Sequence, residues 1–285
     1  NYSQRAYYLA TVADSIYLNP MGGISLTGIN ASVMFMKGLL DKIGIKAEVI
    51  RHGKYKSAIE PFTLTKLSEE NRQQITEYIT PVWNSMISEI AKSRKINHAE
   101  VQKAVDSLLL FDGAYALQNK YVHKLVYRDE VTERIKARTG ASVQSYVTLN
   151  NYILSPLSDD EDRASESDNI IALIFAEGEI RMGNSDEGII GAETLTKAIE
   201  SATDDSKVKA IVLRINSPGG DALASELIWR ELEKARKKKP VIASMGNVAA
   251  SGGYYIACGA DTILASEHTL TGSIGVFGLM FNMQE

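Results

Sequence analysis

Cysteine is almost absent from this 285-residue sequence, which contains only Cys258 and so can form no internal disulfide. Its four histidines and this cysteine form no cluster with the spacing of a zinc site. We therefore expect neither metal nor redox chemistry, and we expect no cofactor.

Positive charge and long apolar runs are also scarce. The 31 Lys and Arg residues are outnumbered by 35 Asp and Glu residues, and the net charge of −4 argues against a nucleic-acid-binding protein. The longest apolar run, IIALIF from Ile170, is far shorter than the roughly 20 residues that cross a bilayer. The sequence shows no initiating Met and no signal peptide, so we interpret it as a piece of a longer polypeptide.

What the sequence does contain is an ordinary globular composition, with 45% apolar and 23% charged residues. Its second half alternates apolar strand patterns with amphipathic helix patterns. We expect strands at 170–176, 210–215, 241–245, 262–264 and 274–277, with helices at 192–202, 222–237 and 249–257. Strands and helices that alternate in this way predict an α/β fold in which parallel sheets are flanked by helices.

An acidic segment divides the chain. Residues 155–168, SPLSDDEDRASESD, contain few apolar side chains and begin with Ser-Pro, which is the composition of a linker. We therefore predict an N-terminal part at 1–154, a linker at 155–169 and a C-terminal part at 170–285. In the N-terminal part we expect a helix at 31–43 and a long one at 68–94, which Pro81 interrupts without ending.

The two parts share a weak internal repeat. YYLA at 7–10 corresponds to YYIA at 254–257, and LTG at 26–28 corresponds to LTG at 270–272. In this alignment Gln4 occupies the position of Ser251, so the first copy has lost the hydroxyl group. The second-copy equivalent of Lys56 falls beyond the last residue of the sequence. If the chain builds one reaction centre, both copies must contribute to it.

The stretch VIASMGNVAASGG at 241–253 carries the strongest chemical signal. An apolar strand pattern leads into small residues and then into a helix, the kind of turn at which α/β folds expose reactive groups. Ser251 stands at this turn, and a second glycine turn, SPGG at 217–220, follows the neighbouring strand pattern. Two such turns can direct backbone N–H groups at a developing oxyanion. We therefore hypothesise that Ser251 is a nucleophile.

A serine nucleophile needs a base, and the sequence offers two kinds of candidate. None of the four histidines lies in a recognisable triad motif, although His268 is close to Ser251 in the repeat unit. A lysine can serve instead if desolvation lowers its pKa well below the usual value of about 10.4. Lys56 differs from the lysines on polar helix faces because it follows a strand pattern and a glycine turn. Its spacing alone does not distinguish a base from an ordinary surface charge.

Four motifs together resemble one known family. HGKYKSAIEPF at 52–62, RINSPGG at 214–220, MGNVAASGGYYIA at 245–257 and LTGSIGVFG at 270–278 resemble, in this order, the signal peptide peptidase A family, also called protease IV. This is a family of Ser/Lys peptidases related in fold to Clp protease and the crotonases. The resemblance spans nearly the whole chain and implies tandem Clp/crotonase-like repeats, as in the long bacterial form of the family.

The resemblance assigns roles to particular residues. It places the nucleophile at Ser251, the general base at Lys56, and a serine that supports the lysine at Ser273. In the family the first repeat supplies the lysine and the second supplies the serine. This division agrees with the loss of the hydroxyl at Gln4.

The resemblance also implies an oxyanion hole made of backbone N–H groups. One donor would be Gly252, and the other would come from the SPGG turn, where we favour Gly220 over Gly219. Taken singly, each motif also has a purely structural interpretation. The SPGG turn could simply cap the helix that follows it, and Ser251 could be a buried hydroxyl at a close helix contact.

On the same grounds, the expected function is that of a membrane-associated bacterial serine endopeptidase that degrades signal peptides after their release. Its substrates would be extended apolar peptides. The resemblance further implies a homo-oligomer, a tetramer in this family, at the bacterial inner membrane with its catalytic part facing the periplasm. Membrane association would come from an N-terminal segment missing from this sequence.

Two other functions stay open. Crotonase-type acyl-CoA enzymes use the same strand and glycine geometry to hold a thioester carbonyl, and they need no serine nucleophile. Turnover of a thioester by Ser251→Ala would favour that function. A non-catalytic assembly scaffold is the other possibility, and it would form oligomers without cleaving anything.

Overall fold

The computed structural model describes residues 1–140, 147–155 and 169–283, and its contacts divide the chain into two compact units. We call residues 1–31 with 79–163 the helical unit, and residues 32–78 with 164–285 the sheet unit. The predicted linker at 155–169 falls almost entirely outside the described residues, and the predicted repeat boundaries stay a prediction.

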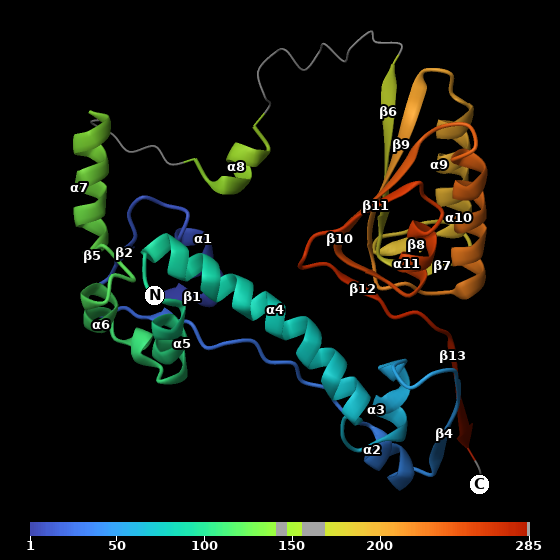
Figure 1. Cartoon of the computed structure of the whole chain (residues 1–285), viewed down its shortest axis with the longest axis horizontal. Coiled ribbons are helices and arrows are strands. Elements are labelled where there is room, and N and C mark those ends of the chain that lie inside the picture. The colour runs from blue at the N-terminus through green and yellow to red at the C-terminus, as the bar shows by residue number, and fades with distance from the viewer. Residues whose placement is uncertain (141–146, 156–168, 284–285) are drawn as a thin grey trace. The chain divides into compact units, whose positions relative to one another are not determined.

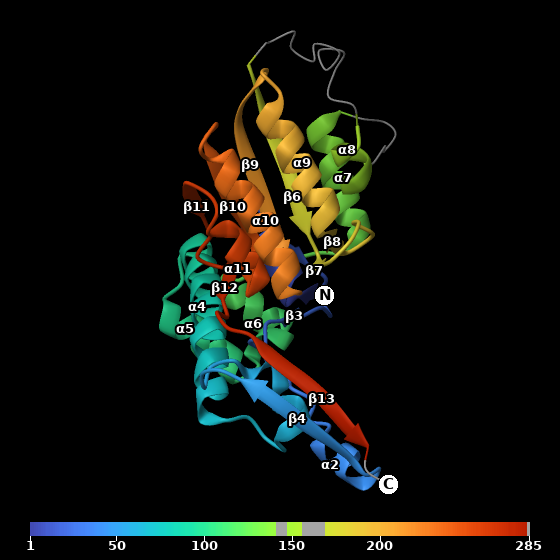
Figure 2. The ribbon, with the colours of Figure 1, turned by 90° about the vertical axis from the view of Figure 1, so that its right-hand side faces the viewer.

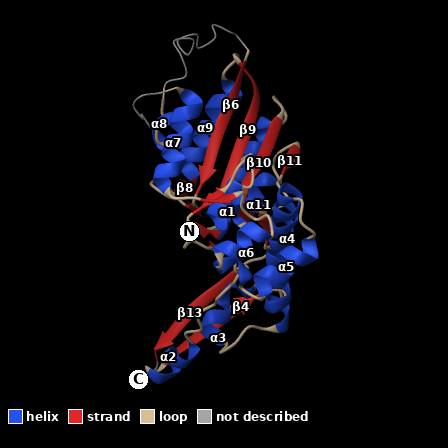
Figure 3. Cartoon of the chain, turned by 90° about the vertical axis from the view of Figure 1, so that its left-hand side faces the viewer, coloured by secondary structure: helices blue, strands red, loops and turns tan. Residues whose placement is uncertain are grey.

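A parallel sheet forms the centre of the sheet unit, in the order β11–β10–β9–β6, with β12 also paired to β10 (Figure 3). Its strands have bounds as follows: β6 Ile170–Glu177, β9 Val208–Ser217, β10 Val241–Ala250, β11 Thr262–Leu264 and β12 Leu270–Gly272. Every one of these pairings is parallel. The predicted α/β architecture is therefore confirmed for this part of the chain.

Helices cover one face of this sheet (Figure 2). Ile211, Leu213 and Ile215 alternate along β9 and are fully buried, and they belong to one apolar core with residues of α9 (Ala192–Asp204), α10 (Ala222–Ala235) and α11 (Gly252–Ala257). Because side chains alternate between the faces of a strand, this period of two directs the apolar set of β9 toward the helices.

An antiparallel ribbon joins two distant parts of the sequence (Figure 1). Strand β4 (Ile45–Arg51) pairs with β13 (Phe277–Met283) from Arg51 opposite Phe277 to Ile45 opposite Met283. Helices α2 (Lys37–Lys42) and α3 (Glu60–Thr63) lie beside this ribbon, and the 3-10 helix η1 (Ser57–Ile59) directly precedes α3. A smaller parallel pair, β7 (Glu179–Arg181) with β8 (Ile189–Gly191), completes the unit.

Several predicted elements have different bounds in the structure, among them the strand expected at 241–245, which continues to Ala250, and the helix expected at 222–237, which ends at Ala235. The helix expected at 249–257 begins only at Gly252, because β10 continues to Ala250 by pairing with β12. The strand expected at 274–277 begins at Phe277, where pairing with β4 starts. The helix expected at 31–43 is reduced to α2, since the N–H of Met36 donates to the carbonyl oxygen of Pro61 rather than to a helical partner.

The helical unit has its own apolar core, with Tyr7, Ile87, Ile90 and Val101 among its fully buried side chains. Helix α4 (Glu69–Arg94) begins in the sheet unit and continues into the helical unit, and it contains Pro81 as predicted. The other elements are β1 Tyr2–Ser3, α1 Gln4–Ala10, β2 Tyr17–Leu18, β3 Ile24–Ser25, α5 His98–Asp106, η2 Leu109–Phe111, α6 Gly113–Gln118, β5 Lys124–Leu125, α7 Arg128–Thr139 and α8 Leu149–Ile153. No helix among the described residues combines the length and apolar character that a membrane crossing requires.

A strand–helix–strand arrangement occurs in both units. Strand β1 leads into α1 and pairs in parallel with β3, and β10 likewise leads into α11 and pairs with β12. In the helical unit the helix starts at Gln4, whose Oε1 accepts hydrogen bonds from the N–H groups of Thr27 and Gly28. A backbone-bound amide therefore occupies this turn, whereas a serine stands at the corresponding turn of the sheet unit.

Candidate active site

Ser251 lies at the turn between β10 and α11, in a conformation with φ 53° and ψ −117°. A non-glycine residue with positive φ is strained, and such strain is characteristic of functional turns. The turn is held in place because the N–H of Ser251 donates to the carbonyl oxygen of Gly272 over 2.8 Å. Gly253 must lack a side chain here, since a Cβ would lie 2.7 Å from the carbonyl oxygen of Ser217.

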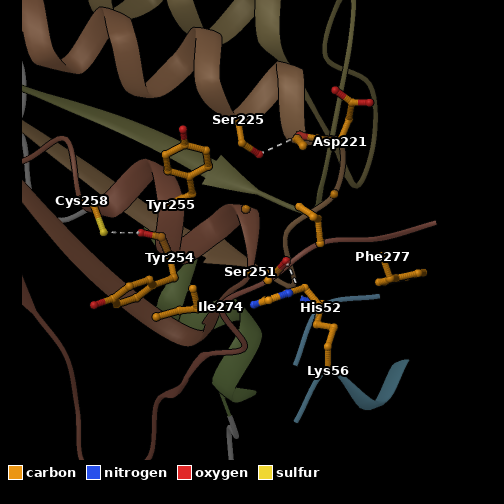
Figure 4. A pocket seen from close by; sticks show the side chains of 15 residues that line it. His52, Lys56, Asp221, Ser225, Ser251, Tyr254, Tyr255, Cys258, Ile274 and Phe277 are labelled. Carbon is orange, nitrogen blue, oxygen red and sulfur yellow. Dashed lines mark hydrogen bonds between the residues drawn. The ribbon is translucent and has the colours of Figure 1, made fainter. Parts of the chain in front are cut away.

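Lys56 reaches this serine from the segment between β4 and η1 (Figure 4). Its Nζ lies 3.0 Å from Oγ of Ser251, 3.1 Å from Oγ of Ser273 and 2.8 Å from the carbonyl oxygen of Ser273. Ser273 is itself a positive-φ residue, with φ 51°. The structure thus brings together three side chains that come from three separate segments of the sheet unit.

The electrostatic environment of Lys56 favours its neutral form. The residue is only 7% exposed, and desolvation by burial lowers the pKa of its amine from the ordinary lysine value. Among the ion pairs given for the described residues, none involves Lys56. A buried amine of this kind is neutral at a lower pH than a surface lysine, and only the neutral form can accept a proton.

The SPGG turn that ends β9 lies against the serine turn. A Cβ on Gly219 would be 2.5 Å from the backbone N of Gly252, and one on Gly252 would be 3.2 Å from the backbone N of Gly220. The N–H of Gly219 donates to Oγ of Ser217 over 3.1 Å. The hydrogen bonds of the described residues include none that uses the N–H of Gly220 or Gly252.

A pocket of about 870 Å³ opens beside these groups (Figure 4). Most of its accessible lining is apolar, and large side chains from α11 and from the segment after β12 supply much of it. The lining residues are His52, Lys56, Gly220, Asp221, Ala222, Ser225, Ser251, Gly252, Tyr254, Tyr255, Cys258, Ile274, Gly275, Val276 and Phe277. Ser251 therefore lines a pocket whose walls are mostly apolar.

Several lining residues gave no chemical signal in the sequence. Ser225 is fully buried and donates through Oγ to the carbonyl oxygen of Asp221, and a Cβ on Gly252 would lie 2.5 Å from that Oγ. His52 lines the same pocket and belongs to the HGKYKSAIEPF stretch that contains Lys56. Nothing in residue type or spacing distinguishes these positions from ordinary core or surface residues.

Of the four histidines, only His52 lines the pocket that contains Lys56 and Ser251, and the hydrogen bonds given for the described residues join its side chain to neither of them. His268 lies in a polar turn with Nε2 3.5 Å from a carboxylate oxygen of Glu267, and it does not line the pocket. His123 accepts a hydrogen bond at Nδ1 from the N–H of Ile16, and His98 begins α5. Within the described part of the chain, no three His, Cys, Asp or Glu side chains gather as a metal site would require.

The constellation combines a serine hydroxyl, a desolvated lysine amine and, at adjoining turns of an α/β sheet, two backbone N–H groups that no hydrogen bond among the described residues uses. Comparison with known proteins supplies the family. The model of "Peptidase family S49" matches residues 1–142 and 233–285, and the chain belongs to this family.

Curated relatives agree with this assignment. "Protease 4" of Haemophilus influenzae is 38% identical over 97% of this chain, and "Protease 4" of Salmonella typhi is 40% identical over 98%. "Serine protease SPPA, chloroplastic" of Arabidopsis thaliana is 33% identical over 98%. The predicted resemblance to the protease IV family is therefore confirmed. The chain spans 46%, 46% and 42% of these relatives' own lengths.

Two solved structures show more limited similarity. A mutant of the "1510-N membrane-bound stomatin-specific protease" shares 26% identity over 33% of this chain and 42% of its own, with a TM-score of 0.28. A mutant of ClpP1 from Listeria monocytogenes shares 23% identity over 35% of this chain and 50% of its own, with a TM-score of 0.27. Both scores are too low to bear on the fold.

Proposed function

We propose that this chain carries the catalytic centre of a serine endopeptidase, with Ser251 as nucleophile and Lys56 as general base. The observation that carries the proposal is the 3.0 Å separation between Nζ of Lys56 and Oγ of Ser251, in a site where burial lowers the pKa of the amine. Membership of peptidase family S49 supports the same reaction.

The mechanism follows from these positions. The neutral amine of Lys56 takes the hydroxyl proton as Oγ of Ser251 bonds to the carbonyl carbon of the scissile peptide bond. The resulting ammonium group then gives this proton to the leaving amine as the C–N bond breaks. Water, activated by the same lysine, releases the acyl group from Ser251 and completes the cycle.

The oxyanion of the tetrahedral intermediate requires backbone donors near Ser251. The N–H groups of Gly252 and Gly220 are suited to this role, because neither is used by another hydrogen bond among the described residues. Gly219 is less suited, since its N–H already donates to Ser217. Each such donor contributes about 3–4 kcal/mol of transition-state stabilisation in a typical serine peptidase.

Ser273 is proposed to orient the lysine. Its hydroxyl and carbonyl oxygens lie 3.1 Å and 2.8 Å from Nζ of Lys56 and leave the amine within reach of Ser251. A lysine side chain that is held in this way loses conformational entropy, because rotation about several of its bonds is restricted. The contacts of Ser273 thus help to keep the base in its reactive position.

The dyad is tested by turnover of a fluorogenic apolar peptide with the purified chain. We expect Lys56→Ala to lower kcat/KM by about 10²–10⁴-fold and Ser251→Ala to lower it at least as much. Lys56→Arg should fail equally, because a guanidinium group does not lose its proton. Lys54→Ala, which removes a lysine with an 81% exposed side chain two residues earlier, is the matched control. Full activity in a folded Ser251→Ala or Lys56→Ala variant would refute the mechanism.

We further propose that the substrates are extended apolar peptides, such as signal peptides after their release, and that the parent protein acts at a bacterial inner membrane on its periplasmic side. The apolar lining of the pocket supports apolar substrates, and the similarity of the chain to proteases supports peptides as the class of substrate. Peptides with charged side chains near the scissile bond should be cleaved at least tenfold more slowly than apolar ones. A peptide library read by mass spectrometry measures this ratio, and equal rates would contradict the proposal.

Tandem repeats and a homo-oligomer, a tetramer as in the family it resembles, complete the proposal. The same family model matches two separate ranges of the chain, and a strand–helix–strand arrangement recurs around Gln4 and Ser251. In this interpretation the first repeat has kept its fold and lost its nucleophile. Sedimentation of the parent protein would give the number of subunits.

A further inference from the structure

One fully buried acid takes no part in the mechanism described above. Glu60 is 0% exposed and lies four residues after Lys56, at the start of α3. Its Oε2 accepts from Nδ2 of Asn71 over 2.8 Å and from the N–H of Ser68 over 3.3 Å, while Oε1 accepts from the hydroxyl of Ser68. Three donors from one neighbouring segment therefore surround this carboxylate.

These donors come from the start of helix α4. Ser68 precedes the helix and caps it, since its Oγ accepts from the N–H of Asn71. The first turn of a helix carries unpaired N–H groups and a partial positive charge, so a carboxylate is favoured there. A buried carboxylate without such partners would be costly. The carboxylate of Glu60 thus fastens α3 to the beginning of a 26-residue helix.

The same connection reaches the lysine. Only the short helix η1 (Ser57–Ile59) separates Lys56 from Glu60, and Ile59 is 3% exposed, so this segment packs tightly. On its other side, Lys56 follows His52 and Gly53, a stretch with exposed side chains and a glycine at φ 81°. The two contacts from that stretch to α4, Lys54 with Glu70 at 3.8 Å and Tyr55 with Gln73 at 3.2 Å, join partly exposed groups and contribute little.

We propose that Glu60 is a positioning residue, which holds the Lys56 segment on the first turn of α4 and so keeps the amine buried beside Ser251. The inference rests on the proposed role of Lys56 as base. It adds a second anchor, outside the pocket, to the contact with Ser273 inside it. Loss of this anchor should release the amine toward solvent without altering the apolar walls of the pocket.

The test is Glu60→Gln in the full chain, with two measurements. The first is the pH dependence of acetylation of each lysine by acetic anhydride, read by mass spectrometry, with exposed Lys54 as internal reference. We expect the midpoint for Lys56 to rise toward that of Lys54, because release restores solvation of the ammonium form. The second is peptide turnover, where we expect kcat to fall about 10- to 100-fold with KM within a factor of two.

Two further variants separate positioning from loss of fold. Glu69→Gln removes an exposed acid from the same helix end without touching the lysine segment, and it should change neither measurement. The double variant Glu60→Gln with Asn71→Asp exchanges the amide and the carboxylate, and it should recover most of the lost kcat. If Glu60→Gln alone does not fold, Asn71→Ala removes a single donor and should shift both measurements in the same direction.

The outcomes are distinct. The proposal is overturned if folded Glu60→Gln has the same labelling midpoint of Lys56 and the same kcat as the wild type. If Glu60→Gln does not fold, the same result in Asn71→Ala overturns it. Failure of the proposed peptidase function would show itself differently, as turnover that persists in Lys56→Ala or is absent from the wild type. The labelling result does not depend on turnover and decides the role of Glu60 in either case.

Discussion

At the scale of single residues, Ser251 and Ser273 share a backbone conformation that is rare among the non-glycine residues of the described chain. Both hold positive φ, at 53° and 51°, and both lie within 3.1 Å of the same lysine amine. Only five non-glycine residues of the described chain have positive φ. Backbone strain at two of them is thus concentrated where two hydroxyl groups and one amine must meet.

The lowered pKa of Lys56 sets the direction of the pH dependence. The base acts only when neutral, and burial favours the neutral form, so kcat/KM should rise with pH and reach half its maximum below the ordinary lysine pKa of about 10.4. A pH–rate profile of the purified chain measures this midpoint. Lys54→Ala should leave it unchanged. A profile that falls from pH 6 to pH 9 would be incompatible with a lysine base.

At the scale of elements, the close approach of α11 to β9 depends on a missing side chain. A Cβ on Gly253 would lie 2.7 Å from the carbonyl oxygen of Ser217 and 3.2 Å from its Cβ. Because neither backbone can move without disturbing the sheet, Gly253→Ala should lower the free energy of unfolding by about 1–3 kcal/mol. Urea denaturation followed by circular dichroism measures the change.

The matched control for this prediction is Gly38→Ala in α2. A Cβ at Gly38 meets nothing within 4 Å, and alanine is the better helix former by roughly 0.5–1 kcal/mol. This variant should therefore keep or slightly raise stability. Equal effects of the two substitutions would show that packing between α11 and β9 is not the cause.

Elements also show which parts of the fold can be predicted from sequence. Strands β6, β9 and β11 were predicted within two residues at each end, since buried apolar runs between turn residues define them locally. The bounds of β10, β12 and β13 could not be predicted in this way. They depend on partners far along the chain, as Ala250 extends β10 by pairing with Gly272.

The same distinction applies to the site. The strand-to-helix turn at Ser251 has a local signal, and the sequence alone suggested a nucleophile there. Lys56 lies 195 residues away and is brought to it by the pairing of β4 with β13, which no local pattern encodes. Spacing therefore left Lys56 undecided, and its role was suggested by resemblance to a family. The roles of Ser273 and the oxyanion donors likewise stay predictions for experiment.

At the scale of the whole molecule, each unit has its own apolar core and one of the two tryptophans. Trp83 belongs to the helical unit and Trp229 to the sheet unit. We expect the single-tryptophan variants Trp83→Phe and Trp229→Phe to show fluorescence transitions at different urea concentrations, because separate cores unfold separately. Loss of turnover should follow the transition reported by Trp229.

Coincident transitions in the two variants would contradict this expectation and would indicate one cooperative structure. Circular dichroism supplies the control, since both variants must show the same two-step curve when secondary structure is followed. The sheet unit contains every group of the proposed mechanism, so its transition alone should govern activity.

The long separation between Lys56 and Ser251 also matters while the protein is being made. A ribosome adding about 5–20 amino acids per second needs roughly 10–40 s to travel the 195 residues from the lysine codon to the serine codon. Strand β13, which pairs beside the lysine segment, emerges later still. Throughout that interval the nascent polypeptide contains Lys56 without Ser251, so the proposed peptidase cannot act on its own chain or on its neighbours until this stretch has been synthesised.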